Sequence, residues 1–272
     1  MKKNKSIPSK EVNNHYTEFL SHYLLPSPAS IMDYFTHSPG KLIVIGARPA
    51  MGKTSLMLSL TKSRSDCPVL IISLELSETQ LEDRYLALSK DNRFLFPVDA
   101  SLEWLGSGGP DLFNCSADHS LVQIRSLLLE QRNDVPVKVV FIDYIQLIKE
   151  TNPDYLTHLK SLAAEFQLAI VAFSQLENTI DAKPMFQPNL EGLLRYDPDI
   201  SQVDDIYYLV RPDRYGTCED EFGYNLCNHA VLYGLKGAFQ GKRGLLKFNG
   251  GKGRFKRTNL FKILSQSNNY SK

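Results

Sequence analysis

The stretch that decides the fold is GARPAMGKTS, residues 46–55. It follows the apolar run KLIVI and precedes the apolar run LMLSL, so a buried strand, a glycine-containing loop and a helix are predicted in succession. The backbone N–H groups of such a loop and the positive end of the following helix form a cradle for phosphate groups. We therefore predict a nucleotide site here; the alternative is a chance Gly-Lys-Thr turn.

The residues of this loop are expected to have distinct roles in nucleotide binding. Gly52 lets the backbone approach the phosphates, Lys53 places a positive charge on the outer phosphates, and the Thr54 hydroxyl can hold Mg²⁺. The usual pattern opens with a glycine that is separated from the Gly-Lys pair by four residues, whereas Ala47 stands at that position in this chain, directly after Gly46. The predicted nucleotide-binding residues are Ala47, Arg48, Pro49, Ala50, Met51, Gly52, Lys53, Thr54 and Ser55.

Three later apolar runs each end at a polar side chain. Because the carboxyl ends of parallel strands meet at one edge of a sheet, these side chains are expected near the phosphate loop. Asp143 is predicted to share Mg²⁺ with Thr54. Glu75 is predicted to be the general base that activates water, and Gln175 to sense the γ-phosphate. The alternative for each is an ordinary strand-end residue without a catalytic part.

Apolar runs alternate with amphipathic segments along most of the chain. This alternation predicts an α/β fold with a mostly parallel twisted sheet and helices on both faces. The turn GAFQGK between two apolar runs predicts a C-terminal β-hairpin, whereas residues 91–117 are expected to be irregular. The predicted strands are 42–46, 69–74, 137–143, 169–174, 206–210, 230–235 and 243–248.

The composition is that of an ordinary globular protein, with 43% hydrophobic and 22% charged residues. No apolar run reaches the ~18 residues that a membrane span needs, and no signal-peptide pattern follows the basic N-terminus. We therefore expect a cytoplasmic protein without a membrane partner. The four cysteines, at positions 67, 115, 218 and 227, are predicted to be free thiols, and the spacing of the last two with His229 matches no common zinc site.

The net charge of +1 hides an asymmetry. Residues 222–272 carry ten Lys or Arg and no Asp or Glu, so the rest of the chain is acidic. A basic end on an acidic body suggests a polyanion as partner; the alternative is a solvated basic face. The candidate contacts to nucleic acid are Lys183 and Arg195, in a long polar segment, and Lys242.

With these residues in view, the chain resembles the C-terminal ATPase domain of DnaB-type replicative helicases, a branch of the RecA-like P-loop NTPases. The matching motifs are GARPAMGKTS, SLEL, IDYIQL and SQL, in that order along the chain. The resemblance implies that Lys53 and Thr54 bind ATP and Mg²⁺. It implies that Glu75 is the catalytic glutamate, Asp143 the second acid and Gln175 the γ-phosphate sensor. It also implies a hexameric ring on single-stranded DNA, and a primase or helicase loader as partner.

The same resemblance divides the chain into three expected parts. Residues 1–27 are predicted to be an N-terminal arm or linker helix, 28–262 the RecA-like ATPase domain, and 263–272 a flexible tail. The helix is predicted over 9–25, because its apolar residues share one stripe and Pro26 follows it. That stripe docks either on a neighbouring subunit or on its own domain. The family's usual N-terminal helical domain has no room in the part that precedes the ATPase domain.

Two departures from the family bear on activity. The family has a Lys-x-Arg near the hairpin, whose arginine reaches the neighbour's ATP; here Lys236 fits, but Ala238 stands at the arginine position. Arg243, across the hairpin, is the candidate substitute at the subunit interface. Since an arginine finger typically contributes a factor of ~10³ or more, its loss predicts a slow ATPase. In the region of the DNA-binding loop, Glu191 stands where the family has an arginine.

Three functions remain open at this point. The first is a DnaB-like helicase or translocase of a phage, plasmid or other mobile element. The second is a nucleotide-binding accessory or adaptor protein without motor activity, which the missing arginine favours. The third is a RecA-like signalling or recombination ATPase, which the pairing of SLEL with IDYIQL disfavours. The oligomeric state in a non-hydrolysable ATP analogue distinguishes a ring-forming motor from an adaptor.

Overall fold

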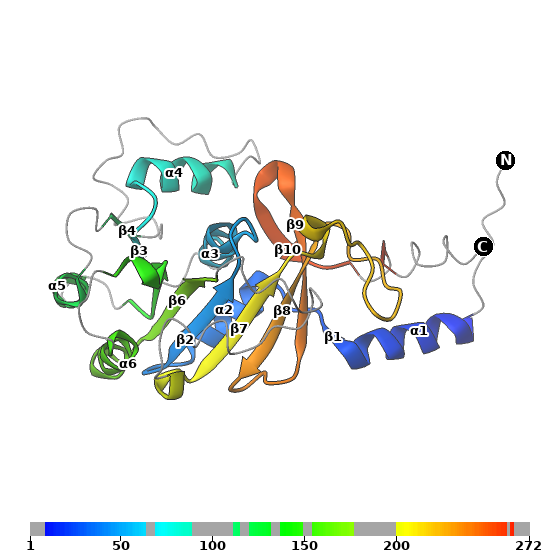
Figure 1. The fold of residues 1–272 in the computed structure, drawn as a ribbon, viewed down its shortest axis with the longest axis horizontal. Coiled ribbons are helices and arrows are strands. Elements are labelled where there is room, and N and C mark those ends of the chain that lie inside the picture. Colours follow the sequence, from blue (N-terminus) through cyan, green and yellow to red (C-terminus); the bar gives the residue numbers. More distant parts are fainter. Residues whose placement is uncertain are drawn as a thin grey trace.

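The computed structural model describes residues 9–63, 69–88, 111–114, 120–131, 137–148, 154–176, 200–259 and 262–263. Its centre is one ten-stranded sheet, with the strand order β1-β9-β8-β7-β2-β6-β5-β3-β4 and with β10 also paired to β9. Figure 1 shows this sheet with helices on both of its faces. The predicted α/β fold with a mostly parallel sheet is therefore confirmed.

The elements follow one another in the predicted alternation. The helices are α1 (Ser9–His22), α2 (Pro28–Thr36), α3 (Lys53–Thr61), α4 (Glu78–Ala87), α5 (Leu121–Gln131) and α6 (Tyr155–Phe166). The strands are β1 (Tyr23–Leu24), β2 (Leu42–Ala47), β3 (Val69–Ser73), β4 (Asp111–Asn114), β5 (Val139–Asp143), β6 (Ala169–Gln175), β7 (Asp205–Val210), β8 (His229–Lys236), β9 (Arg243–Asn249) and β10 (Arg254–Arg257).

The sheet is parallel in its centre and antiparallel at its C-terminal side. β2 lies between β6 and β7 and is parallel to both, and β5 and β3 continue the parallel part. β7, β8 and β9 pair antiparallel, which confirms the predicted hairpin. The central strands β2, β3 and β5 are buried along their whole length because helices cover both faces. One apolar core lies under α2, α3 and α4, and a second under α5 and α6.

Capping residues explain where two of the helices begin. Ser27 precedes α2, accepts a hydrogen bond from the backbone N–H of Ser30 and has Pro28 directly after it. Ser77 and Gln80 form the capping box predicted at the start of α4, with Gln80 Oε1 accepting from the backbone N–H of Ser77. The capping boxes at the starts of α2 and α4 both satisfy backbone N–H donors that the start of a helix otherwise leaves without partners.

Three strand assignments differ from the prediction. The first helix ends at His22 rather than at 25, because Tyr23 and Leu24 pair with β9. Residues 111–114, expected to be irregular, form β4 against β3. Residues 254–257, in the basic C-terminal segment, form β10 against β9. For β1 and β4, pairing with a strand distant in the sequence supplies hydrogen bonds that the local sequence does not signal, whereas β10 pairs with the strand directly before it.

The prediction of free thiols is wrong for two of the four cysteines. Cys218 and Cys227 form a disulfide, with their Cα atoms 4.5 Å apart. The prediction rested on chain length, which does not measure how close a tight loop brings two side chains. Cys67 and Cys115 lie outside the described residues. Within the described part of the chain, no cluster of His, Cys, Asp and Glu suits a metal ion by itself, and no helix is long and apolar enough to cross a membrane.

Candidate nucleotide site

The phosphate loop connects β2 to α3, as predicted. Gly52 directly precedes α3 and has a φ of +96°, in the left-handed region that favours glycine. A Cβ atom at this position would also lie 3.3 Å from the ring of Phe255 in β10. Glycine is therefore required at position 52 both by the backbone and by the ring packed beside it.

Lys53 points from the first turn of α3 towards the end of β6. Its Nζ donates a hydrogen bond to Oε1 of Gln175 at 3.0 Å and lies 5.8 Å from the centre of the Tyr144 ring. The lysine is buried, and this burial lowers its pKa, while the negative charges of Asp143 and Glu75 oppose the shift. The structure thus brings together Lys53 and Gln175, two of the predicted catalytic residues.

Thr54 and Asp143 form the second predicted contact of the site. The Thr54 hydroxyl donates to Asp143 Oδ2 at 2.7 Å. Asp143 is fully buried, and burial raises the pKa of its carboxyl group. Its other oxygen, Oδ1, has no hydrogen-bond partner. A buried carboxylate oxygen without a partner, next to a hydroxyl, fits the oxygen ligands that Mg²⁺ prefers.

Gln146 is a site residue whose part the sequence did not reveal. It lies in a short 3₁₀ turn after β5, and its Nε2 donates to Ser174 Oγ at 2.7 Å. Its Oε1 accepts from the backbone N–H of Gln175 at 3.0 Å. Gln146 therefore fixes the end of β6, which carries the predicted sensor. The IDYIQL motif contains this residue, but only the fold shows what it contacts.

Lys53, Thr54 and Gln175 border one pocket of about 590 Å³. Glu75 lies on its wall with an exposed side chain, two residues beyond the end of β3. Three arginines that sequence reasoning missed, Arg84, Arg211 and Arg214, also border it. No sequence signal marks them, because α4 and the exit of β7 reach this pocket only through the fold. The remaining lining residues are Pro49, Ala50, Gly52, Lys53, Thr54, Ser55, Gln175, Phe248 and Gly250.

Contacts at the exit of β7 hold the loop in place. Arg48 Nη1 donates to the Tyr215 hydroxyl at 3.3 Å, and Met51 Sδ accepts from the backbone N–H of Arg211 at 3.4 Å. The Arg211 guanidinium is buried, lies 3.8 Å from the centre of the Phe248 ring and donates to Asp213. The phosphate loop is thus packed against the segment that supplies two of the pocket's arginines.

The predicted interface and DNA residues lie elsewhere or outside the described residues. Lys236 Nζ donates to the carbonyl oxygens of Ile200 and Ser201 in its own chain. Arg243 forms an ion pair with Glu221. Lys242 borders a separate cavity of about 350 Å³ beside α2. Lys183 and Arg195 lie outside the described residues. Their parts at an interface or on DNA stay predictions.

A phosphate loop between a parallel strand and a helix, with a carboxylate on a neighbouring strand beside its threonine, defines a P-loop NTPase domain. The chain belongs to the DnaB-like helicase C-terminal domain family, whose model matches residues 30–93 and 110–236.

Comparison with known proteins finds relatives that are replicative DNA helicases. It is 27% identical over 212 residues to the replicative DNA helicase DnaB of Leifsonia xyli subsp. xyli, covering 68% of this chain and 46% of that protein. It is 29% identical over 203 residues to a probable plasmid replicative DNA helicase of Chlamydia psittaci, covering 65% of this chain and 44% of that protein. The chain therefore spans less than half the length of these relatives.

Solved structures confirm the predicted RecA-like ATPase fold. One is described as a DnaB-like replicative helicase and its interactions with primase; the TM-score is 0.68 at 23% identity, over 94% of this chain and 68% of that one. Another is the ATPase domain of G40P, with a TM-score of 0.67 at 23% identity, over 94% of this chain and all (100%) of that one. At this identity the likeness concerns the fold.

Proposed function

We propose that this chain binds ATP with Mg²⁺ and hydrolyses it to move along single-stranded DNA, as the motor domain of a DnaB-like replicative helicase. The observation that supports this most is one pocket lined by Lys53, Thr54, Gln175 and Glu75, with the buried Asp143 hydrogen-bonded to Thr54. A protein that only binds nucleotide does not need a carboxylate placed to activate water. The similarity to a plasmid helicase supports work in the cytoplasm on a plasmid or phage replicon.

The residues of the pocket suit the parts of ATP. The backbone N–H groups of the loop and the Lys53 ammonium would hold the β- and γ-phosphates, and Thr54 with Asp143 would hold Mg²⁺. Bound Mg²⁺ neutralises charge on the phosphate oxygens. Glu75 has an exposed side chain that can orient a water molecule and take its proton.

Gln175 would link the nucleotide to the DNA. Its side chain accepts from Lys53, and its backbone N–H is held by Gln146. A γ-phosphate that draws the Lys53 ammonium towards itself competes for this hydrogen bond. The segment 177–199, which follows directly, carries Lys183 and Arg195, the predicted DNA contacts. Loss of the Lys53–Gln175 hydrogen bond when ATP binds would thus change the end of β6, to which the segment 177–199 is directly joined.

The pocket's own arginines would offset the missing arginine at Ala238. Ala238 donates its backbone N–H to Asp205 Oδ1, in its own chain. Arg84 and Arg214 are exposed at the pocket, and Arg211 is buried there. Positive charge supplied in cis can stabilise the charge that develops on a transferred phosphoryl group, as a neighbour's arginine does in trans. Ring assembly into a hexamer, with Lys236 and Arg243 at the interface, and a primase or loader as partner, belong to the same proposal.

The alternative function is a nucleotide-dependent accessory or adaptor protein. The alanine at position 238 favours it, because it removes the group that couples neighbouring subunits in the family. The two functions differ in turnover rather than in nucleotide binding.

The deciding experiment measures ATP turnover with and without single-stranded DNA. The variants are Lys53→Ala and Glu75→Gln, each matched with a surface substitution, Lys138→Ala at the opposite end of β5 and Glu82→Gln on α4. We expect DNA to stimulate turnover, both site variants to abolish it, and both surface variants to retain it. Nucleotide binding with negligible turnover, with or without DNA, would establish the adaptor instead.

A further inference from the structure

The C-terminal half of α1 packs on a loop that follows β7, residues 216–228. Phe19 is fully buried, with its ring edge-on to Tyr224 at 4.9 Å between centres. The Tyr23 hydroxyl donates to Asp220 Oδ2 at 2.7 Å. His22 stacks on Phe222 with ring centres 3.7 Å apart. We call this loop the α1 seat.

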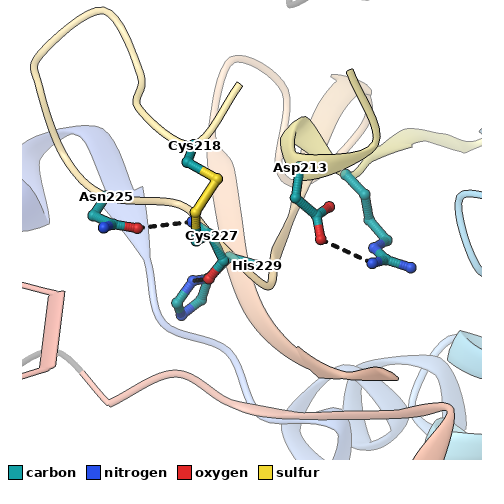
Figure 2. The surroundings of a disulfide bond; sticks show 6 residues. Asp213, Cys218, Asn225, Cys227 and His229 are labelled. Carbon is teal, nitrogen blue, oxygen red and sulfur yellow. Dashed lines mark hydrogen bonds and ion pairs between the residues drawn. A yellow bond between two sulfur atoms is a disulfide. The ribbon is translucent and has the colours of Figure 1, made fainter. Parts of the chain in front are cut away.

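The α1 seat is closed by the Cys218–Cys227 disulfide, which Figure 2 shows. All the loop residues that contact α1 lie between the two cysteines in the sequence. Within the loop, Leu226 N–H donates to the Cys218 carbonyl at 2.6 Å, and Asp220 N–H donates to the Tyr224 carbonyl at 3.1 Å. The disulfide thus encloses the part of the surface under α1 that the loop supplies.

The sheet also contributes to the place where α1 ends: β1 follows α1 and pairs with β9, and Val231 of β8 and Leu245 of β9 belong to the same apolar cluster as Phe19. Phe19 and Tyr23 belong to a third, small apolar cluster, distinct from the two cores that cover the sheet. Two of that cluster's members, Tyr224 and Leu226, come from the seat itself. Figure 1 shows α1 projecting away from the body of the domain. The position of α1 therefore depends in part on the order of the loop that the Cys218–Cys227 bond closes.

We propose that Cys218–Cys227 is a reversible redox site that controls how firmly α1 is held on its own domain. In the oxidised chain the closed loop keeps the seat ordered and α1 docked. In the reduced chain the loop gains conformational freedom, the aromatic contacts are lost more often, and α1 is released. This proposal concerns α1 docking and does not depend on ATP hydrolysis.

The chemistry is thiol–disulfide exchange with a small thiol of the glutathione class. Both cysteines are half-buried rather than part of the core. The thiolate of the reductant attacks one cysteine sulfur, the Cys218–Cys227 bond breaks, and a mixed disulfide forms. A second small thiol resolves it, so that two electrons pass to the protein, two protons complete its thiols, and the reductant leaves as its disulfide. In a thiol-rich cytoplasm, the few protein disulfides that form are usually transient or redox-sensing.

The test is amide hydrogen exchange by mass spectrometry on the full chain, in glutathione disulfide and in dithiothreitol. Closing a loop of this length removes enough freedom from its open state that reduction should raise exchange in α1 and in 216–228 on the order of tenfold or more. A Cys67→Ser/Cys115→Ser variant should respond like the natural chain. A Cys218→Ser/Cys227→Ser variant should exchange fast in both conditions.

Two results would overturn the proposal. One is an equal rate of amide hydrogen exchange in α1 of the oxidised and the reduced natural chain. This comparison uses no variant, so it does not depend on whether a variant folds. The other is alkylation of both Cys218 and Cys227 after equilibration with glutathione disulfide, which would show that the bond does not form in solution. A third variant, Tyr224→Ala, tests the seat without touching sulfur: α1 should exchange fast even in the oxidised chain, and unchanged protection would contradict the role given to the seat.

Discussion

At the scale of single residues, the site depends on side chains that hold one another. Lys53 contacts Gln175, and Gln146 fixes the backbone of the same glutamine. Gln146 is not among the residues that line the pocket, so we regard it as a positioning residue. Its effect on activity should pass through the orientation of Gln175.

Replacing Gln146 by alanine should leave the Gln175 N–H without its partner and loosen the end of β6. An unmade buried hydrogen bond costs about 1–3 kcal/mol, so we expect kcat to fall roughly tenfold or more, while the KM for ATP changes little. Steady-state ATP turnover measures this. Gln240→Ala, on the exposed hairpin turn, is the matched control. An unchanged kcat would show that Gln175 is positioned without Gln146.

Replacing Asp143 by asparagine tests the magnesium site. We expect Mg²⁺-dependent turnover to fall on the order of a hundredfold or more, because the buried oxygen that would ligate the ion is lost. The control is Asp83→Asn on the exposed face of α4. Since burial raises the pKa of Asp143, Mg²⁺-dependent nucleotide binding in the natural chain should also weaken at a less acidic pH than for an exposed carboxylate. Unchanged Mg²⁺-dependent turnover in the Asp143→Asn variant would rule out Thr54 and Asp143 as the pair that holds Mg²⁺.

At the scale of elements, β10 supports the phosphate loop from the other end of the chain. Phe255 is buried, its ring lies against Gly52, and its backbone N–H donates to Ser59 Oγ in α3. A strand from the basic C-terminal segment thus holds the helix that begins at Lys53.

Truncating Phe255 to alanine should lower the free energy of unfolding by about 3 kcal/mol or more, through the lost contacts and the cavity left behind. It should also weaken nucleotide binding, because the loop at Gly52 loses its support. Urea unfolding and nucleotide titration measure the two effects. Phe255→Leu, which keeps most of the volume, should cost less than about 1.5 kcal/mol. An unchanged free energy of unfolding in the Phe255→Ala variant would show that Phe255 does not support the phosphate loop.

Lys62, at the end of α3, gives a prediction about pH. Its burial, together with the neighbouring Arg254, lowers the pKa of Lys62 to about 8, although its Nζ donates to the Tyr85 carbonyl. Between pH 8 and about 10.4, the unfolded lysine keeps a proton that the folded one has lost, so stability should rise with pH through that window. We expect Lys62→Met to remove this rise. Parallel slopes of unfolding free energy against pH in both proteins would contradict the assignment.

At the scale of the whole molecule, the open question is assembly. The parallel sheet and the pocket are complete within one chain, whereas the family's arginine finger acts between chains and is replaced here by Ala238. We therefore expect a single chain to bind nucleotide without a neighbour, whereas a ring is required only by the motor proposal.

Native mass spectrometry with Mg²⁺ and a non-hydrolysable ATP analogue should show a hexamer. The hexamer should be absent without nucleotide or in the Lys53→Ala variant, because nucleotide is expected to complete the interface. Its appearance would support the motor, and Arg243→Ala, matched with Arg257→Ala on β10, would then test the interface cation. A monomer in every condition would support the adaptor.

The sequence by itself determined the phosphate loop, the neighbouring parallel strands and the acidic and amide residues at their ends. These are contiguous patterns: an apolar run of strand length, a glycine-bearing loop and a polar residue at a strand end are each read within about ten residues. Parallel order then brings such strand ends to one edge without further information. This is why Lys53, Asp143 and Gln175 could be predicted together.

Only the tertiary structure decided the rest. β1 and β4 exist because strands distant in the sequence supply their hydrogen bonds, and Arg84, Arg211 and Arg214 reach the pocket from segments that carry no motif. The same holds for the Cys218–Cys227 bond and for α1, whose docking on its own domain was one of two alternatives. Such contacts form between segments that only the folded chain brings together. Because their stabilisation comes from residues of different segments, no local sequence pattern predicts them.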